Sequence, residues 1–298
     1  MEEILFALWV LLLLANLAGI LVAAWRIGAR RGLAARPADR PPVSVVVPLR
    51  GIEAFTAETL ASAFRLDWPD YELVFCVADA GDPVIDRVRT VMSMHPRVPA
   101  RILVGDDRIS ANPKLNNCCK GWQAARHDWV AIADSNVLMP ADYIRRLMAA
   151  RRADTGLVCS MPLASRPAGF WAEVECAFLN GLQARWQFAG EAVGLGFAQG
   201  KSMLWHKPLL DANGGIGALA AEIAEDAAAT KLVRSLGLRV HLVAAPFEQP
   251  IGRRSLGEVW ARQGRWSRLR RVTFPLFFLP ELLVGAVPAL LVGLAAAA

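Results

Sequence analysis

The sequence predicts an α/β domain built on a parallel β-sheet, with apolar membrane segments at the two ends of the chain. Three observations predict this arrangement. The chain has 298 residues, enough for one domain of roughly 200 residues plus appendages. Counting Gly and leaving out Tyr, roughly 62% of its residues are apolar, against roughly 45–50% in soluble domains. Between the two ends, short apolar runs alternate with helical stretches.

The N-terminal end is the first apolar segment. Residues 4–24 are apolar except for Asn16 and Gly19, and as a helix they rise about 31 Å, close to the hydrocarbon thickness of a bilayer. Glu2 and Glu3 precede this run, whereas a cleaved signal peptide begins with a basic region. We therefore predict an uncleaved transmembrane anchor over residues 1–25.

A basic linker follows the anchor at residues 26–41. Positively charged residues flank membrane spans on the cytoplasmic side. The linker has Asp39 as its only acid and five arginines: Arg26, Arg30, Arg31, Arg36 and Arg40. The domain that follows is therefore predicted to face the cytoplasm.

The central domain is expected over residues 42–250. Apolar runs predict strands at 43–47, 72–78, 100–104 and 129–133. The intervening segments predict helices at 56–64, 83–94, 114–125 and 141–151. Such alternation is typical of a parallel sheet covered by helices on both faces, which binds ligands beyond the carboxyl ends of its strands.

Two of these strands end in carboxylates. Asp79 follows the second strand, where it can accept hydrogen bonds from the ring or hydroxyl groups of a nucleotide, and Asp82 lies three residues on. Asp82 has a second interpretation, as the cap of the next helix with Pro83 at its first position. Asp134 follows the fourth strand, where one carboxylate suits Mg²⁺ or Mn²⁺ bound to a diphosphate and an Asx-turn is an equal alternative.

A third acidic element is the pair Glu225 and Asp226, in the helical stretch 222–236. Acidic residues early in a helix also suit its dipole, so a structural role carries equal weight for this pair taken alone.

The segment Gly200-Lys201-Ser202 matches the end of a phosphate-binding P-loop. The spacing excludes that motif, because GxxxxGK[ST] requires Gly at position 195, where this chain has Leu195. We expect ordinary loop glycines here.

The basic charge is concentrated in residues 251–273. This segment carries one acid, Glu258, and seven arginines, which together equal the net charge of +6 of the whole chain. Trp260 and Trp266 lie among them and an apolar segment, residues 274–298, follows, as at a lipid headgroup boundary. Membrane contact is therefore favoured over nucleic-acid binding, which usually spreads a basic face over a folded domain.

With these motifs, the sequence resembles the inverting, membrane-bound glycosyltransferases of ceramide glucosyltransferase type, which form glycosyltransferase family 21 and are related to family 2. The resemblance covers roughly residues 42–273. It rests on Cys76-Val77-Ala78-Asp79 with Asp82-Pro83, Asn112-Pro113-Lys114-Leu115-Asn116-Asn117, Asp134-Ser135-Asn136, Glu225-Asp226 and Arg262-Gln263-Gly264-Arg265-Trp266, which fits the family's (Q/R)xxRW element.

The resemblance implies a GT-A fold and transfer of a sugar, glucose in the family's ceramide glucosyltransferases, from a UDP-sugar to a lipid hydroxyl. It also implies a divalent metal, Mg²⁺ or Mn²⁺. The implied roles are uridine binding by Asp79 and Asp82, nucleotide contact by Lys114, metal and diphosphate binding by Asp134, proton acceptance by Asp226, and closure over the diphosphate and acceptor by Arg262, Arg265 and Trp266.

Two positions depart from the family pattern. Many GT-A enzymes carry Asp at the third position of the metal motif, where this chain has Asn136. Gln183-Ala184-Arg185 stands where animal ceramide glucosyltransferases have His-Pro-Arg, which leaves a diacylglycerol or another hydroxylated lipid open as acceptor. The amphipathic segment 169–189 is expected to form either part of a lipid-facing surface or a core helix.

Two other functions are weighed against this one. A processive polysaccharide synthase shares these motifs, but it is expected to carry several transmembrane helices. A non-catalytic membrane scaffold leaves the three acidic elements and the arginine motif unexplained.

Overall fold

The computed structural model describes residues 2–31 and 39–297. Its centre is a seven-stranded sheet with the strand order β3-β2-β1-β4-β7-β5-β8. The strands are β1 (Val43–Leu49), β2 (Tyr71–Val77), β3 (Ala100–Val104), β4 (Trp129–Ala133), β5 (Thr155–Ser160), β7 (Ser202–His206) and β8 (Arg239–Leu242). The first four are the strands that the sequence predicts, and they are confirmed as parallel.

Strand β7 makes the sheet a mixed one. It lies antiparallel to both of its neighbours, β4 and β5, while β5 and β8 are parallel. Because β7 runs the opposite way, its first residue lies beside the last residue of β4, with Ser202 opposite Ala133. The segment before β7 therefore reaches the same edge of the sheet as the carboxyl ends of β1, β2 and β4.

Helices cover both faces of the sheet. One face packs on α2 (Thr56–Ala63), α3 (Val84–Met94) and α5 (Tyr143–Ala149). The other face packs on α4 (Pro113–Ala124), α8 (Lys207–Asp211), the 3-10 turn η2 (Gly215–Ala221) and α9 (Glu225–Ser235). The helical stretch expected at 222–236 thus begins at Glu225, after the separate turn η2.

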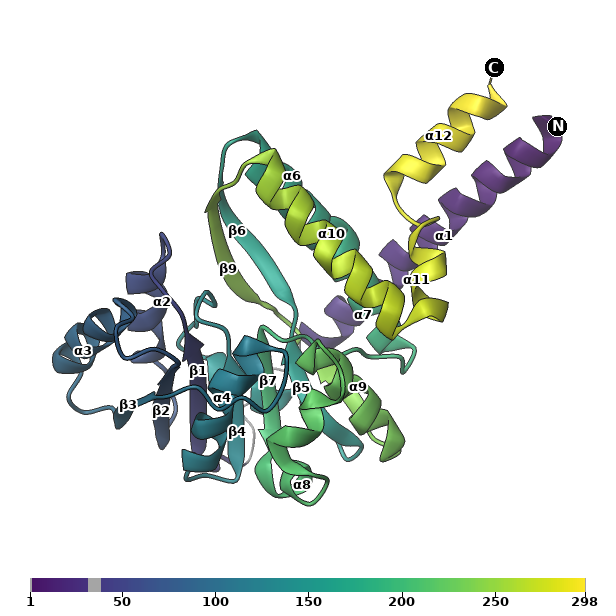
Figure 1. Cartoon of the computed structure of the whole chain (residues 1–298). Helices are drawn as coiled ribbons and strands as arrows, with labels where there is room; N and C mark the ends of the chain where they lie inside the picture. The colour runs from purple at the N-terminus through teal and green to yellow at the C-terminus, as the bar shows by residue number, and fades with distance from the viewer. Residues whose placement is uncertain (1, 32–38, 298) are drawn as a thin grey trace.

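A second, smaller layer stands above the carboxyl edge of the sheet (Figure 1). Strands β6 (Pro162–Ala168) and β9 (Phe247–Arg253) pair in parallel. Helix α6 (Phe170–Ala177) packs on both strands, and α10 (Leu256–Thr273) packs on α6. A π-helical turn, η1 (Phe178–Gln183), joins α6 to α7 (Ala184–Ala192). The basic segment predicted at 251–273 is thus mostly one helix, and Ser255 and Glu258 form a capping box at its start.

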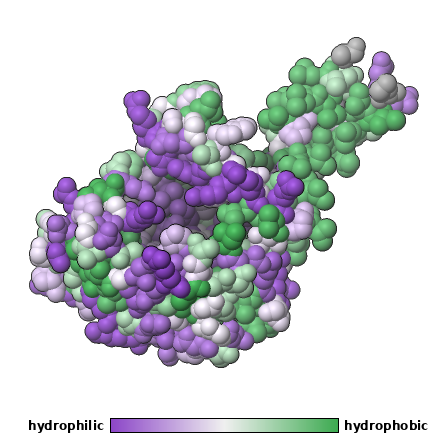
Figure 2. Space-filling view, viewed as in Figure 1, coloured by the Kyte–Doolittle hydropathy of each residue, from purple (hydrophilic) through white to green (hydrophobic). Residues whose placement is uncertain are grey.

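The two ends of the chain project together from this body (Figure 1). Helix α1 (Glu2–Arg31) lies against α12 (Ala286–Ala296), which follows α11 (Pro275–Glu281). Among the described residues, α1 alone is a single helix long and apolar enough to cross a membrane, and α11 with α12 reaches that length only as a pair bent by 50°. Figure 2 shows a largely hydrophobic surface over the projection.

The two interruptions in the apolar run of α1 are contact points with α7. The Asn16 side-chain oxygen accepts a hydrogen bond of 2.8 Å from Arg185. A Cβ atom at Gly19 would lie 3.1 Å from the Trp186 ring, so a larger residue here would require the ring to shift by a few tenths of an ångström. The helix continues to Arg31, and residues 32–38 of the predicted basic linker lie outside the described residues.

Candidate functional site

The carboxyl edge of the sheet brings together two predicted acidic residues and the segment before β7. Asp134 follows β4 and Asp79 follows β2, with β1 between these strands. Lys201, immediately before β7, lies next to Asp134, whose backbone N–H donates to the Lys201 carbonyl at 3.0 Å. Figure 2 shows a hydrophilic recess above this edge and beside α10.

The segment 112–117 links this edge to the helices. Asn112 caps α4, because its side-chain oxygen accepts from the backbone N–H groups of Lys114 and Leu115. Asn117 donates to the carbonyls of Leu49 and Cys76, at the ends of β1 and β2. The asparagines of this motif therefore fix the position of Lys114 relative to the strand ends.

Lys114 is the centre of the site. Its Nζ lies 2.6 Å from Asp134 Oδ1, 2.6 Å from Glu225 Oε1 and 2.6 Å from the carbonyl oxygen of Gly200. Asn112 Nδ2 donates to the other Glu225 oxygen at 2.6 Å. The side chains of a strand end, the first turn of α4 and the first turn of α9 thus converge on one ammonium group.

Electrostatics keep these groups charged although they are enclosed. Burial disfavours the charged form of Asp134, but Lys114 and Lys201 outweigh it and lower the pKa of this carboxyl to about 2. Burial likewise opposes the charge on Lys114, yet Asp134 and Glu225 hold its pKa well above the usual value.

Asp226 lies beside this cluster in a different state. Its Oδ2 accepts from the backbone N–H of Gly200 at 3.3 Å. Burial, and next the charge of Glu225, raise the pKa of Asp226 to about 6. A carboxylate with a pKa near neutrality suits proton acceptance from a bound hydroxyl.

Two side-chain oxygens at the end of β4 suit a divalent cation. The described part of the chain has no cluster of three or more His, Cys, Asp or Glu side chains able to hold a metal ion. A cation carried by a diphosphate needs few protein ligands. Asp134 Oδ2 and Asn136 Oδ1 converge on one point, since Lys201 Nζ lies 2.8 Å from the first and 3.2 Å from the second. These two hard oxygens fit one cation.

Asp79 and Asp82 have unequal surroundings. Asp79 is exposed, and its side chain accepts from the N–H of Gly81 at 2.9 Å. Asp82 accepts from Val84, the first residue of α3, at 2.9 Å and from Gly51 in the loop after β1 at 2.8 Å. The geometry of Asp82 matches the helix-start interpretation, while Asp79 has the more accessible carboxylate.

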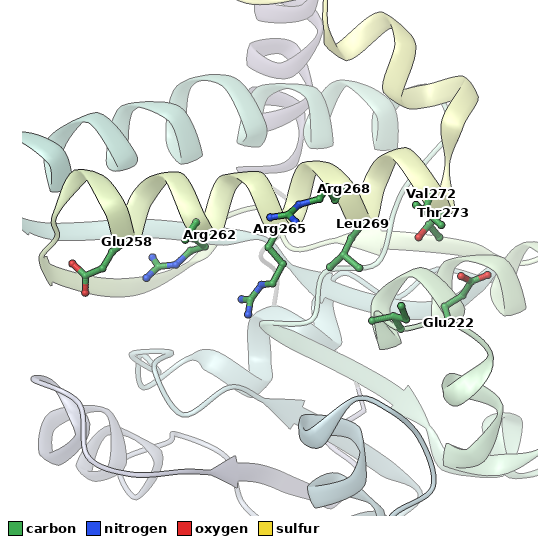
Figure 3. A pocket seen from close by; sticks show the side chains of 10 residues that line it. Glu222, Glu258, Arg262, Arg265, Arg268, Leu269, Val272 and Thr273 are labelled. Atoms are coloured by element: carbon green, nitrogen blue, oxygen red, sulfur yellow. The ribbon is translucent and has the colours of Figure 1, made fainter.

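Helix α10 lies across this region, and its arginines differ in how far they are buried. Arg262 pairs with Glu175 of α6 at 2.8 Å and 3.0 Å, and Trp266 packs against the small cluster that contains Ala172 and Leu179. Arg265 is exposed and projects from α10 toward the body (Figure 3). It lines a cavity of about 780 Å³ between α10 and the loop at Glu222 and Ile223.

Four residues of this site were not singled out as site residues from the sequence. Asn112 carried a signal, since an Asn before Pro is a typical helix start. Asn117 lies in the motif 112–117 and Lys201 in the excluded P-loop match, but for these two residues and for Glu175 the contact partners are far away in the sequence. Glu175, for example, is fully buried and contacts Arg262, Gln263 and Arg254.

The curated relatives are longer proteins than this chain. The chain is 30% identical over 237 residues to ceramide glucosyltransferase 1 of Caenorhabditis elegans, covering 79% of this chain and 51% of that protein. It is 26% identical over 250 residues to ceramide glucosyltransferase 3 of the same organism, covering 83% and 54%. The chain thus spans about half the length of these relatives.

A solved structure shares the fold. The mannosyltransferase PcManGT from Pyrobaculum calidifontis, in complex with GDP-Man and Mn²⁺, matches with a TM-score of 0.61 and 20% identity, over 95% of this chain and 77% of that chain. This likeness confirms the predicted GT-A class of α/β fold.

The pattern of glycosyl transferase family 21 matches residues 11–298, nearly the whole chain. Together with the fold and the convergence of the motif residues on Lys114, this match is decisive: the chain belongs to glycosyl transferase family 21.

Proposed function

We propose that the chain is the donor-binding and catalytic part of a membrane-bound inverting glycosyltransferase that moves a sugar from a UDP-sugar to a lipid hydroxyl. Glucose and a ceramide-like acceptor are the first substrates to test, because the curated relatives carry the name ceramide glucosyltransferase. The observation that carries the proposal is the cluster at Lys114, which joins Asp134 to the acidic pair of α9.

The donor would lie along the carboxyl edge of the sheet. Asp79 would accept hydrogen bonds from the uridine, with Asp82 holding the neighbouring turn against Gly51. Lys114 and Arg265 would pair with the diphosphate. A divalent cation, Mg²⁺ or Mn²⁺, held by Asp134 and Asn136 would supply further positive charge for the departing diphosphate.

The transfer would be a single displacement. The acceptor oxygen forms a bond to the anomeric carbon, the bond from that carbon to the diphosphate oxygen breaks, and UDP leaves with the electron pair. Asp226 accepts the proton of the acceptor hydroxyl. Arg262 and Trp266 hold α10 against α6, so that Arg265 points at the leaving group.

The membrane segments would hold the site at the lipid headgroups. In this proposal residues 1–25 anchor the chain, residues 26–41 link the anchor to the catalytic domain at 42–250, residues 251–273 lie at the interface and residues 274–298 enter the membrane. The site faces the cytoplasm, because the arginines lie on the body side of both apolar ends.

The test is transfer into lipid. Membranes containing the chain are incubated with labelled UDP-glucose and a lipid extract, and we expect label in the organic phase, with inverted anomeric configuration by NMR. Label in an insoluble polymer would instead identify a polysaccharide synthase, and no transfer with any UDP-sugar would favour a scaffold. In inside-out vesicles, protease protection of the central domain would contradict the cytoplasmic orientation.

A further inference from the structure

Lys201 is a cation placed at the proposed metal position by the fold itself. It lies in the segment before β7, the antiparallel strand that brings this segment to the carboxyl edge. Its ammonium lies 2.8 Å from Asp134 Oδ2 and 3.2 Å from Asn136 Oδ1. Its side chain is only 18% exposed.

Both oxygens of Asp134 are therefore engaged by lysines. Lys114 occupies Oδ1 and Lys201 occupies Oδ2. A divalent cation that binds to Asp134 and Asn136 must take the place of the Lys201 ammonium, because the same two oxygens face both. Asn136 contributes no negative charge, so the divalent ion gains less here than it would between two carboxylates.

Lys201 also reduces the net negative charge of the cluster. At neutral pH, Lys114 and Lys201 stand against Asp134, Glu225 and Asp226, which leaves one net negative charge. Without Lys201 the cluster carries two, and it would repel an anionic diphosphate more strongly.

We propose that Lys201 is a built-in cation of the donor site. It competes with the divalent ion for Asp134 and Asn136, and it pairs with the diphosphate when the metal is absent. Nucleoside diphosphate binding is therefore partly independent of metal. This inference rests on the proposed function, because it takes a UDP-sugar as the donor.

The test uses the full chain in detergent with UDP and Mn²⁺ as probes. Calorimetry measures UDP affinity in EDTA, and electron paramagnetic resonance of free Mn²⁺ measures metal affinity. In Lys201→Met we expect UDP affinity in EDTA to fall about tenfold or more, and Mn²⁺ affinity to rise by about the same factor, since one nearby positive charge is removed. Lys201→Arg should keep UDP binding in EDTA.

Lys207→Met is the matched control. Lys207 directly follows the last residue of β7, whereas Lys201 directly precedes the first. Lys207 pairs with Asp211 at 2.9 Å and lies at the opposite edge of the sheet from Lys201. Both affinities should stay unchanged in this variant. If Lys201→Met does not fold, as judged by circular dichroism, Asn136→Asp replaces it, with the same two expected changes.

Three outcomes would overturn the inference. Unchanged UDP and Mn²⁺ affinities in Lys201→Met would make the contact a structural ion pair and leave the proposed function standing. Mn²⁺ affinity that falls in Lys201→Met would exclude competition. A wild-type chain that binds no UDP under any condition would remove both the inference and the proposed donor.

Discussion

Asp226 differs from Glu225 in its contacts and from Asp134 in its raised pKa. It shares the first turn of α9 with Glu225, but Glu225 is bonded to Lys114 and Asn112, whereas Asp226 contacts the backbone of Gly200. Of these two acids, Glu225 thus holds the cluster together, and under the proposed function Asp226 is the one that accepts the proton.

The first prediction separates these two roles. Asp226→Asn keeps the shape of the side chain but cannot accept a proton at neutral pH, so transfer should fall on the order of 10²–10⁴-fold while UDP still binds. Glu225→Gln is the control, and it should lower the melting temperature because it weakens the contact to Lys114. Transfer at near wild-type rate by folded Asp226→Asn would move the base elsewhere.

The second prediction is a pH profile. Asp226 must be ionised to accept a proton and its pKa is about 6, so kcat/KM should fall as the pH drops below about 6 and level off above it. Because the folded pKa lies above the usual 3.8, the protonated group stabilises the fold, and this stability is lost as the pH rises through about 6. Asp226→Asn should therefore melt higher than wild type at pH 8 but not at pH 3.5. Activity that rises toward acid pH would contradict the assignment.

At the scale of elements, the contact between α6 and α10 decides where the arginine motif points. Glu175 is fully buried on α6 and receives Arg262 through two hydrogen bonds, with Arg254 3.8 Å away. A buried carboxylate keeps its charge only with such partners, so the pair fixes the rotation of α10 about its own axis.

The third prediction tests this contact. Glu175→Gln weakens charge-assisted hydrogen bonds, and we expect a loss of about 1–3 kcal/mol in unfolding free energy together with a higher KM for the donor. Glu173→Gln, an exposed change on the same helix, should alter neither quantity. Equal melting temperatures for the two variants would show that α10 is held by other contacts.

The sequence predicts those strands whose own residues form an apolar run. Strands β1 to β4 are mostly apolar runs, and Asp79 and Asp134 follow the ends of β2 and β4. Strands β6 and β9 carry Pro and Arg within them, which is typical of loops, and no local pattern reports that β7 runs antiparallel.

The site was predictable in its members but not in its contacts. The acids and Lys114 lie in recognisable motifs, yet Lys114 and Glu225 are more than a hundred residues apart and meet only because α4 and α9 pack on the same face of the sheet and on η2. Lys201 lies in a segment that the sequence predicts only as a loop, and its partner Asp134 comes from a neighbouring strand.

For the whole molecule, the junction between α1 and the catalytic body is a buried ionic network. Arg26 pairs with Glu191 at 2.8 Å, both side chains being 1% exposed, and also donates to the carbonyls of Leu242 and Val243. Glu191 in turn contacts His241, which contacts Asp154. The body side of α1 is therefore part of the domain fold.

The fourth prediction follows from this burial. Arg26→Ala removes a buried cationic partner of Glu191, and breaking such a buried pair should cost about 3–5 kcal/mol of unfolding free energy. Arg89→Ala, which breaks an exposed pair with Asp86, should cost about 0–1 kcal/mol. Similar thermal melting curves for these two variants in detergent would show that the junction does not stabilise the fold.

The fixed junction at Arg26 has a consequence for where product forms. If α1 crosses the bilayer, as the proposed function has it, the buried contacts of Arg26 would hold the domain at one face of the membrane. Under the proposed function, the enzyme glycosylates only lipids whose hydroxyl faces the leaflet next to the domain. Glycolipid in the opposite leaflet would have to be carried there by a separate flipping step, so the sidedness of the product is set by the orientation of a single helix.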